Sequence, residues 1–448
     1  MEFQTLKRSH LKRNIIIGVV CIAIISAVVL NFTRAKYRTT QSIPLVTGTI
    51  NYSLADLNIV AITIDGKEVD TIPDGNYELT SESYCTVNGE KDNNVKLSYD
   101  SATEGLSVTP MTTKGTKCYL YFETATTKKV DTILGQIEVN LDTPNFSKTA
   151  QAGCSSTSKC EETNGIYEAE DDDGTTYYFR GAVDNNWVSF AGYYWRIIRI
   201  NGDGSIRMIY SGNGSPATTG TDTQIGTNTF SINSTTYNNI AYVGYMYTVG
   251  QVHGLGTNSG IKNTLDSWYQ TNIASKGYGD KVSTEAGFCG DREPSTNSST
   301  SNGQGGTGTT VTYYGGYIRL VNSTKSPTLK CKNNEDMYTV SGSSRGNKAL
   351  TNPVGLITAD EVSMAGGVYG QTNQSYYLYT NSAYWTMSPY YFDVGGSNSW
   401  AYVFRVNSSG QLGGYWVSNA YGVRPVINLS TDVTAKLGNG TSSTPYEI

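Results

Sequence analysis

The sequence predicts an α+β fold in which strands far outnumber helices. Tyrosine and glycine are abundant, at 34 and 48 of the 448 residues, and this profile favours strands and turns over helical bundles. Two later segments nevertheless have helical spacing of their apolar residues, and an apolar run lies near the N-terminus. We therefore expect a small all-β sandwich and a larger α+β domain, preceded by an N-terminal transmembrane helix.

The apolar run near the N-terminus covers residues 15–30 and follows four basic residues. At 1.5 Å per residue this run spans about 24 Å, and its neighbours can lengthen it toward the thickness of a bilayer core. We predict a cytoplasmic tail at 1–13 and a membrane anchor at 14–32. The protein would then be a single-pass protein of the cell membrane, with the bulk of the chain extracellular. A cleaved signal peptide is the alternative.

Seven cysteines are present, and one of them, Cys21, lies within the apolar run. Six cysteines allow fifteen pairings, of which we expect the one that joins sequence neighbours. An even number outside the membrane segment fits an oxidising compartment. The expected disulfides are Cys85–Cys118, Cys154–Cys160 and Cys289–Cys331.

The first domain, at 45–125, has the pattern of short strands and tight turns. Residues 59–64 alternate in a strand-like way before the turn Asp65–Gly66, and residues 118–122 form another apolar strand. We interpret this domain as a β-sandwich that acts as a spacer. Residues 126–165, rich in Ser, Thr and Lys, are predicted to be a linker.

The second domain is predicted to cover 166–432. Its clearest hairpin joins a strand at 193–200 to one at 205–210 through the turn Asn201–Gly204. Ile261, Leu265 and Tyr269 have helical spacing. A second helix is expected to begin at the capping box Thr358–Glu361.

Catalytic motifs are scarce in this chain. It has only two histidines, so a Ser–His–acid triad would depend on His253. The acidic run at 168–173 lacks the bidentate Glu that a calcium loop requires, and we read it as a hairpin turn. We predict no enzyme activity, no cofactor and no metal. The net charge of -5 gives no reason to expect nucleic acid as a partner.

Residues 384–421 have the composition of a recognition surface. They contain eleven aromatic residues but only two charged ones, Asp393 and Arg405, among Ser, Asn and Gly. Antibody paratopes combine rigid aromatic area with adaptable polar groups in the same way. About half of these rings could serve a β-rich core instead. The predicted ligand-binding residues are Tyr390, Tyr391, Asp393, Arg405, Asn407, Gln411, Gly413, Tyr415, Ser418 and Asn419.

An ordered set of motifs in 160–430 resembles a family of cell-surface proteins of gut-dwelling low-GC Gram-positive bacteria. The motifs are Tyr177–Gly181, Gly192–Ile198, Gly355–Glu361, Tyr384–Pro389 and Gly422–Leu429. The resemblance implies a C-type-lectin-like domain, related to formylglycine-generating enzymes and to variable proteins diversified by retroelements. In the diversified members, variation falls in the last strands, and residues 390–421 have that character.

The chain departs from the active members of this fold. The nearest match to a calcium-dependent sugar site is Glu293–Ser295, without the Trp-Asn-Asp that accompanies such sites, and the last cysteine is Cys331. Calcium-dependent sugar binding and formylglycine generation are therefore not expected.

The resulting hypothesis is a membrane-anchored receptor or adhesin of a bacterial surface. Its ligand would be a host or bacterial surface protein or glycan. Diversification by a retroelement is a further expectation from the resemblance. A cell-surface enzyme acting on wall or glycan, or a structural envelope protein, is the alternative.

Overall fold

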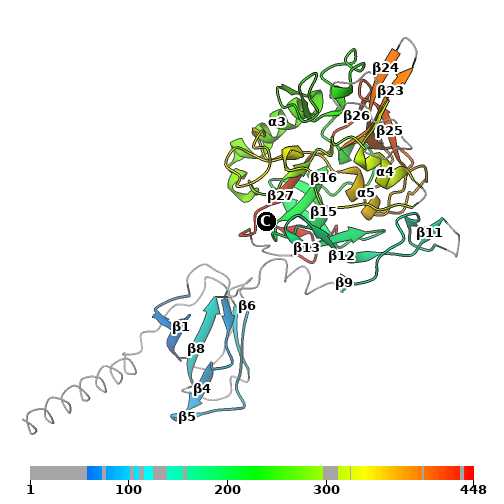
Figure 1. Ribbon diagram of the computed structural model, residues 1–448. Coiled ribbons are helices and arrows are strands. Elements are labelled where there is room, and N and C mark those ends of the chain that lie inside the picture. The colour runs from blue at the N-terminus through cyan, green and yellow to red at the C-terminus, as the bar shows by residue number, and fades with distance from the viewer. Residues whose placement is uncertain are drawn as a thin grey trace, which may run out of the picture. The chain divides into compact units, whose positions relative to one another are not determined.

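The computed structural model describes residues 58–72, 77–100, 105–109, 116–124, 139–154, 159–295, 311–322, 324–395, 398–433 and 438–448. The chain divides into two compact units, Met1–Thr126 and Thr127–Ile448, hereafter unit 1 and unit 2 (Figure 1).

Unit 1 is a sheet with the strand order β2-β1-β8-β4-β5, in which β3 also pairs with β8. The β6–β7 hairpin packs its apolar residues against the same core. Cys85 and Cys118 are opposite each other on β4 and β8, and their disulfide forms as predicted. The strands are β1 (Asn58–Ile64), β2 (Lys67–Val69), β3 (Tyr77–Leu79), β4 (Tyr84–Val87), β5 (Glu90–Lys91), β6 (Lys96–Asp100), β7 (Gly105–Thr109) and β8 (Lys117–Thr124).

Unit 2 contains a larger sheet with the order β27-β16-β15-β13-β12-β9, in which β14 also pairs with β15, and β28 pairs with β14. The hairpin predicted at Asn201–Gly204 is confirmed, because β15 and β16 pair across it. The strands of this first sheet are β9 (Val139–Asn140), β12 (Gly165–Asp171), β13 (Gly174–Arg180), β14 (Trp187–Phe190), β15 (Tyr193–Ile200), β16 (Ile206–Asn213), β27 (Val426–Leu429) and β28 (Tyr446–Glu447).

The second sheet of unit 2 has the order β17-β26-β23-β24-β25, and β21 also pairs with β23. Its β23–β24 hairpin extends beyond the rest of the unit (Figure 1). The strands are β17 (Thr227–Thr229), β21 (Thr312–Tyr313), β23 (Tyr384–Gly395), β24 (Asn398–Val406), β25 (Leu412–Trp416) and β26 (Ala420–Gly422). Three short pairs complete the strands: β10 (Thr149–Ala150) with β11 (Cys160–Glu161), β18 (Met246–Tyr247) with β19 (Thr257–Asn258), and β20 (Phe288–Cys289) with β22 (Met337–Tyr338).

Helices are few and short in the described residues. Ser259 caps α3 (Gly260–Asn272), and the predicted capping box of Thr358 and Glu361 opens α5 (Ala359–Met364). The third helix is α4 (Gly315–Val321). Single turns of 3-10 helix are η1 (Thr221–Thr223), η2 (Ile240–Val243), η3 (Ala274–Lys276), η4 (Gly279–Lys281) and η5 (Asn334–Asp336).

The predicted fold class was wrong. The described part of the chain is mostly β, so neither the α+β class nor a C-type-lectin-like domain preceded by a transmembrane helix is retained. The two helical patterns were real, but they produced helices of only 13 and 6 residues.

The predicted localisation, a single-pass membrane protein, is also corrected. The expected cytoplasmic tail at 1–13 and anchor at 14–32 lie outside the described residues. Among the residues that are described, no helix is both long enough and apolar enough to cross a bilayer.

Unit 2 uses more of the chain than the predicted 166–432. The described parts of the expected linker supply β9, which pairs with β12, and the β10–β11 pair. At the other end, β28 pairs with β14. The Cys154–Cys160 and Cys289–Cys331 disulfides of this unit form as predicted.

Candidate binding face on the second sheet

Four aromatic side chains lie in register across four strands of the second sheet. Tyr313 on β21 is opposite Tyr391 on β23, Tyr391 is opposite Tyr402 on β24, and Tyr402 is opposite Trp416 on β25. Directly opposite residues project to the same face of a sheet. We call this row of Tyr313, Tyr391, Tyr402 and Trp416 the aromatic ladder.

The ladder is only partly covered by the rest of the protein. Its three tyrosines are half-buried, and Trp416 is 40% exposed, one of the few large apolar side chains at the surface. Trp400, two residues before Tyr402 on the same face, stacks on Trp416 with ring centroids 5.8 Å apart. The exposed end of the ladder is therefore a tryptophan pair.

Two neighbouring pairs of rings in the ladder, Tyr313–Tyr391 and Tyr391–Tyr402, are stacked. The Tyr391 and Tyr402 centroids are 4.5 Å apart with planes 11° apart, and those of Tyr313 and Tyr391 are 5.6 Å apart at 22°. Burial and the neighbouring Tyr402 hydroxyl raise the pKa of Tyr391, which stays neutral. Because the faces of Tyr391 and Tyr402 cover each other, these two rings present their edges and hydroxyl groups to a ligand. Trp416 instead meets Tyr402 edge-on, with ring planes 71° apart.

A β-bulge gives the ladder its support. The β23–β24 register shifts between Pro389 and Tyr391, and such a shift re-aims side chains locally. Tyr390, only 7% exposed, packs edge-on against Phe404 at 4.8 Å. A Cβ on Gly414 would meet the Tyr390 ring at 2.1 Å, so this glycine admits the ring that underlies the ladder.

The opposite face of the same strands holds an arginine between two rings. The Arg405 guanidinium lies 4.5 Å from the centroids of both Tyr415 and Tyr421. Burial lowers the pKa of Arg405, although the two tyrosines oppose this effect. Cation–π attraction offsets part of the cost of burying the charge.

The structure divides the predicted binding residues between several places. Tyr391 belongs to the ladder, whereas Tyr390 is buried and so cannot project to solvent as expected. Arg405, Gly413 and Tyr415 lie on the opposite face. The others are half-buried: Asp393 near the hairpin tip, Asn407 and Gln411 in the β24–β25 turn, and Ser418 and Asn419 before β26.

Sequence reasoning left Tyr313, Tyr402 and Trp416 out of the predicted site. Alternation of Tyr402 with the buried Ala401 and Val403 was a usable signal. The alignment of the four strands could not be predicted from the sequence. Their register depends on the bulge in β23 and on the pairing of Tyr391 with Tyr313, which is distant in the sequence.

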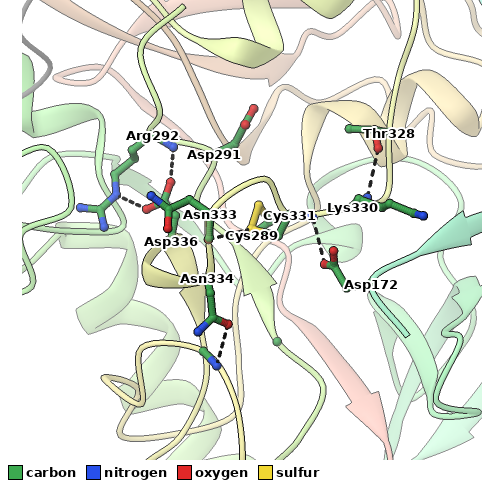
Figure 2. The surroundings of a disulfide bond; sticks show 12 residues. Asp172, Cys289, Asp291, Arg292, Thr328, Lys330, Cys331, Asn333, Asn334 and Asp336 are labelled. Carbon is green, nitrogen blue, oxygen red and sulfur yellow. Dashed lines mark hydrogen bonds and ion pairs between the residues drawn. A yellow bond between two sulfur atoms is a disulfide. The ribbon is translucent and has the colours of Figure 1, made fainter. Parts of the chain in front are cut away.

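A charged cleft lies elsewhere in unit 2, beside the Cys289–Cys331 disulfide. Figure 2 shows the disulfide with Asp172, which accepts a hydrogen bond from the Cys331 N–H at 2.9 Å. On the same wall, Glu361 bridges Arg207 at 2.5 Å and Arg199 at 3.1 Å. Burial alone would raise the pKa of Glu361, but the two arginines outweigh it and lower the pKa.

Two further carboxylates share one arginine in this cleft. Arg319 contacts Asp291 at 2.6 Å and Asp360 at 2.8 Å. Burial, with Asp360 reinforcing it against Arg319, raises the pKa of Asp291 from 3.8 to about 6. Together with the pair of Arg199 and Asp171, the last residue of β12, these ion pairs connect β12, β15, β16, α4 and α5, so the cleft acts first as a structural joint.

His253 lies near this joint, between the carboxylates of Glu293 and Asp336. Its Nε2 is 3.2 Å from Glu293 Oε2, and its Nδ1 is 3.5 Å from Asp336 Oδ1. Asp336 also pairs with Arg292 at 2.6 Å, as Figure 2 shows. A hydrogen bond to Asp336 raises the pKa of His253 in spite of burial. In the described ranges, His, Cys, Asp and Glu side chains do not gather in a group of three or more that could hold a metal ion.

No family model, no curated protein and no solved structure matches this chain.

Proposed function

We propose that unit 2 is a binding module, a receptor or adhesin, that engages a protein partner through the aromatic ladder. One observation carries the proposal: four half-buried or exposed aromatic rings lie in register on a face with few charges. Tyrosine and tryptophan dominate the energetics of protein interfaces. Three disulfides suit work in an oxidising compartment.

The geometry favours a protein over a glycan as the ligand. A sugar ring that stacks on an aromatic side chain needs a free ring face. In the ladder the faces of Tyr391 and Tyr402 are turned toward each other, 4.5 Å apart. Ring edges and hydroxyls suit the mixed polar and apolar surface of a protein.

The test compares binding of the purified chain to immobilised extracellular proteins and, in parallel, to a glycan array. The double variant Tyr402→Ser and Trp416→Ser should bind a protein of the panel at least about tenfold more weakly, since ladder residues act as hot spots. Tyr194→Ser, a half-buried tyrosine of the first sheet, is the matched control and should bind normally.

Two results would count against the proposal. Protein binding that is equally strong in the double variant would show that the ladder is not the contact surface. Ladder-dependent binding to glycans alone would replace the protein ligand with a sugar.

A further inference from the structure

The aromatic ladder ends on an edge strand. In the described residues β25 pairs with β24 along its length, and its other side meets only the bridge of Tyr369 to Leu412. An edge strand presents backbone N–H and C=O groups that can pair with another chain.

Two backbone hydrogen bonds at the ends of the β24–β25 pairing determine which groups of β25 point outward. Asn407 N–H donates to Gln411 O at 2.9 Å, and Val417 N–H donates to Ala401 O at 3.1 Å. Hydrogen-bonded and non-hydrogen-bonded pairs alternate in an antiparallel ladder. The pairs of Leu412, Gly414 and Trp416 with β24 are therefore of the second kind, and their backbone groups face away from β24.

Of these three residues, only Leu412 has hydrogen-bond partners for both its backbone N–H and its backbone C=O. Leu412 N–H donates to Val368 O at 3.3 Å and Leu412 O accepts from Gly370 N–H at 3.1 Å. Trp416 O accepts from Asn419 N–H. Among the described residues, the Gly414 N–H, the Gly414 C=O and the Trp416 N–H have no such partner.

The edge also lacks the usual protection against pairing. Natural edge strands are blocked by charged side chains, proline or bulges. The five residues of β25, LGGYW, include no charge and no proline, and its register with β24 is unbroken.

We infer that β25 accepts an extended segment of the protein partner as an added strand. This inference rests on the proposed function and specifies how the partner is held. The segment pairs with Gly414 and Trp416 through its own backbone, and places an apolar or aromatic side chain beside Trp416, where it continues the ladder. Backbone pairing supplies affinity, and the side chain beside Trp416 supplies selectivity.

The test uses a phage-displayed library of random linear dodecapeptides, selected on the full chain and counter-selected on its Tyr402→Ser variant. Amide hydrogen exchange is then measured with and without a synthetic copy of each selected peptide. Exchange at Gly414 and Trp416 should slow by about 100-fold at a peptide concentration of 100 times Kd. Tyr415, whose N–H already faces β24, serves as the internal reference and should change less.

A second measurement uses the same peptides with N-methyl groups on every other residue. One of the two alternating sets should abolish binding, because it removes the N–H groups that face β25, and the other should be tolerated. Peptides that need Tyr402 but leave Gly414 and Trp416 exchange unchanged overturn strand addition and leave the proposed function standing. If no selected peptide depends on Tyr402, strand addition is overturned too, and the protein panel decides the proposed function separately.

Discussion

The charged cleft and the aromatic ladder of unit 2 invert the usual arrangement of side chains. In the cleft, Glu361 and Arg207 are 3% and 1% exposed and pair with each other. On the ladder, Trp416 is 40% exposed. Charges are thus buried in pairs where strands and short helices meet, and rings are exposed where the second sheet ends. The cleft therefore stabilises the fold, whereas the ladder is the surface that we propose for recognition.

The largest expected effect comes from breaking a buried pair in the cleft. Glu361→Gln keeps the side-chain shape but removes the charge that Arg207 and Arg199 share. Removing one partner of a buried pair leaves an uncompensated charge, which costs about 3–5 kcal/mol. Urea unfolding should show this loss, whereas Glu168→Gln, at an exposed site, should change stability by no more than about 0.5 kcal/mol. Equal effects of the two variants would mean that the cleft is not a structural joint.

Removing the charge of Asp291 should have the opposite effect to Glu361→Gln and stabilise the folded state at neutral pH. The pKa of Asp291 is about 6 in the folded chain against 3.8 ordinarily. Between pH 3.8 and about pH 6, the folded state therefore keeps a proton on Asp291 that the unfolded state has released. Stability from this group is complete below pH 3.8 and is lost as the pH rises to about 6. Asp291 has a positive φ of 49°, which asparagine tolerates.

Asp291→Asn should consequently match the native chain near pH 3.5. By pH 7 it should be the more stable of the two, by an amount on the order of 3 kcal/mol. Urea unfolding at both pH values measures the difference. A native chain that is the more stable at pH 7 would show that Arg319 holds the Asp291 charge favourably.

On the ladder, stability and binding should separate. Tyr402→Ser removes a half-buried ring and its stacking on Tyr391, so the cost should be about 1 kcal/mol. Tyr384→Ser removes a tyrosine that is fully buried and should cost about 3–5 kcal/mol. Thermal unfolding measures both. A Tyr402 variant that unfolds as readily as the Tyr384 variant would place the ladder in the core instead.

Local patterns predicted the parts of this molecule that depend on near neighbours. The Asn201–Gly204 hairpin, the capping box of Thr358 and Glu361, and the three disulfides all formed as expected. Each follows from residues close in sequence, or from cysteines paired in order along the chain.

Long-range relations escaped prediction, as the cleft and the ladder illustrate. Arg199 and Glu361 are 162 positions apart, and the local sequence around either residue does not indicate that the two form an ion pair. Tyr390 and Tyr391 were both predicted to be binding residues. The bulge that buries one ring and exposes its neighbour depends on how β23 pairs with β24.

The smallest expected effect is at Arg405, where a half-buried charge lies between two half-buried rings. Arg405 was one of the predicted ligand-binding residues. The structure places it between Tyr415 and Tyr421, on the face opposite the ladder. Arg405→Ala removes two cation–π contacts, which destabilises the fold, but it also removes the cost of burying the charge. The net loss of stability should be about 0.5–1 kcal/mol. Phe404→Ala, one position away and fully buried, should cost about 3–5 kcal/mol.

Because Arg405 faces away from the ladder, its alanine variant should also bind any ladder-dependent peptide with unchanged Kd. Titration of the peptides selected against the Tyr402→Ser variant measures this directly. A tenfold loss of binding in the Arg405 variant, with thermal stability intact, would move the contact surface to the opposite face, where the sequence first located it. Unchanged binding would give Arg405 a structural role between Tyr415 and Tyr421, and would confine recognition to the face of the aromatic ladder.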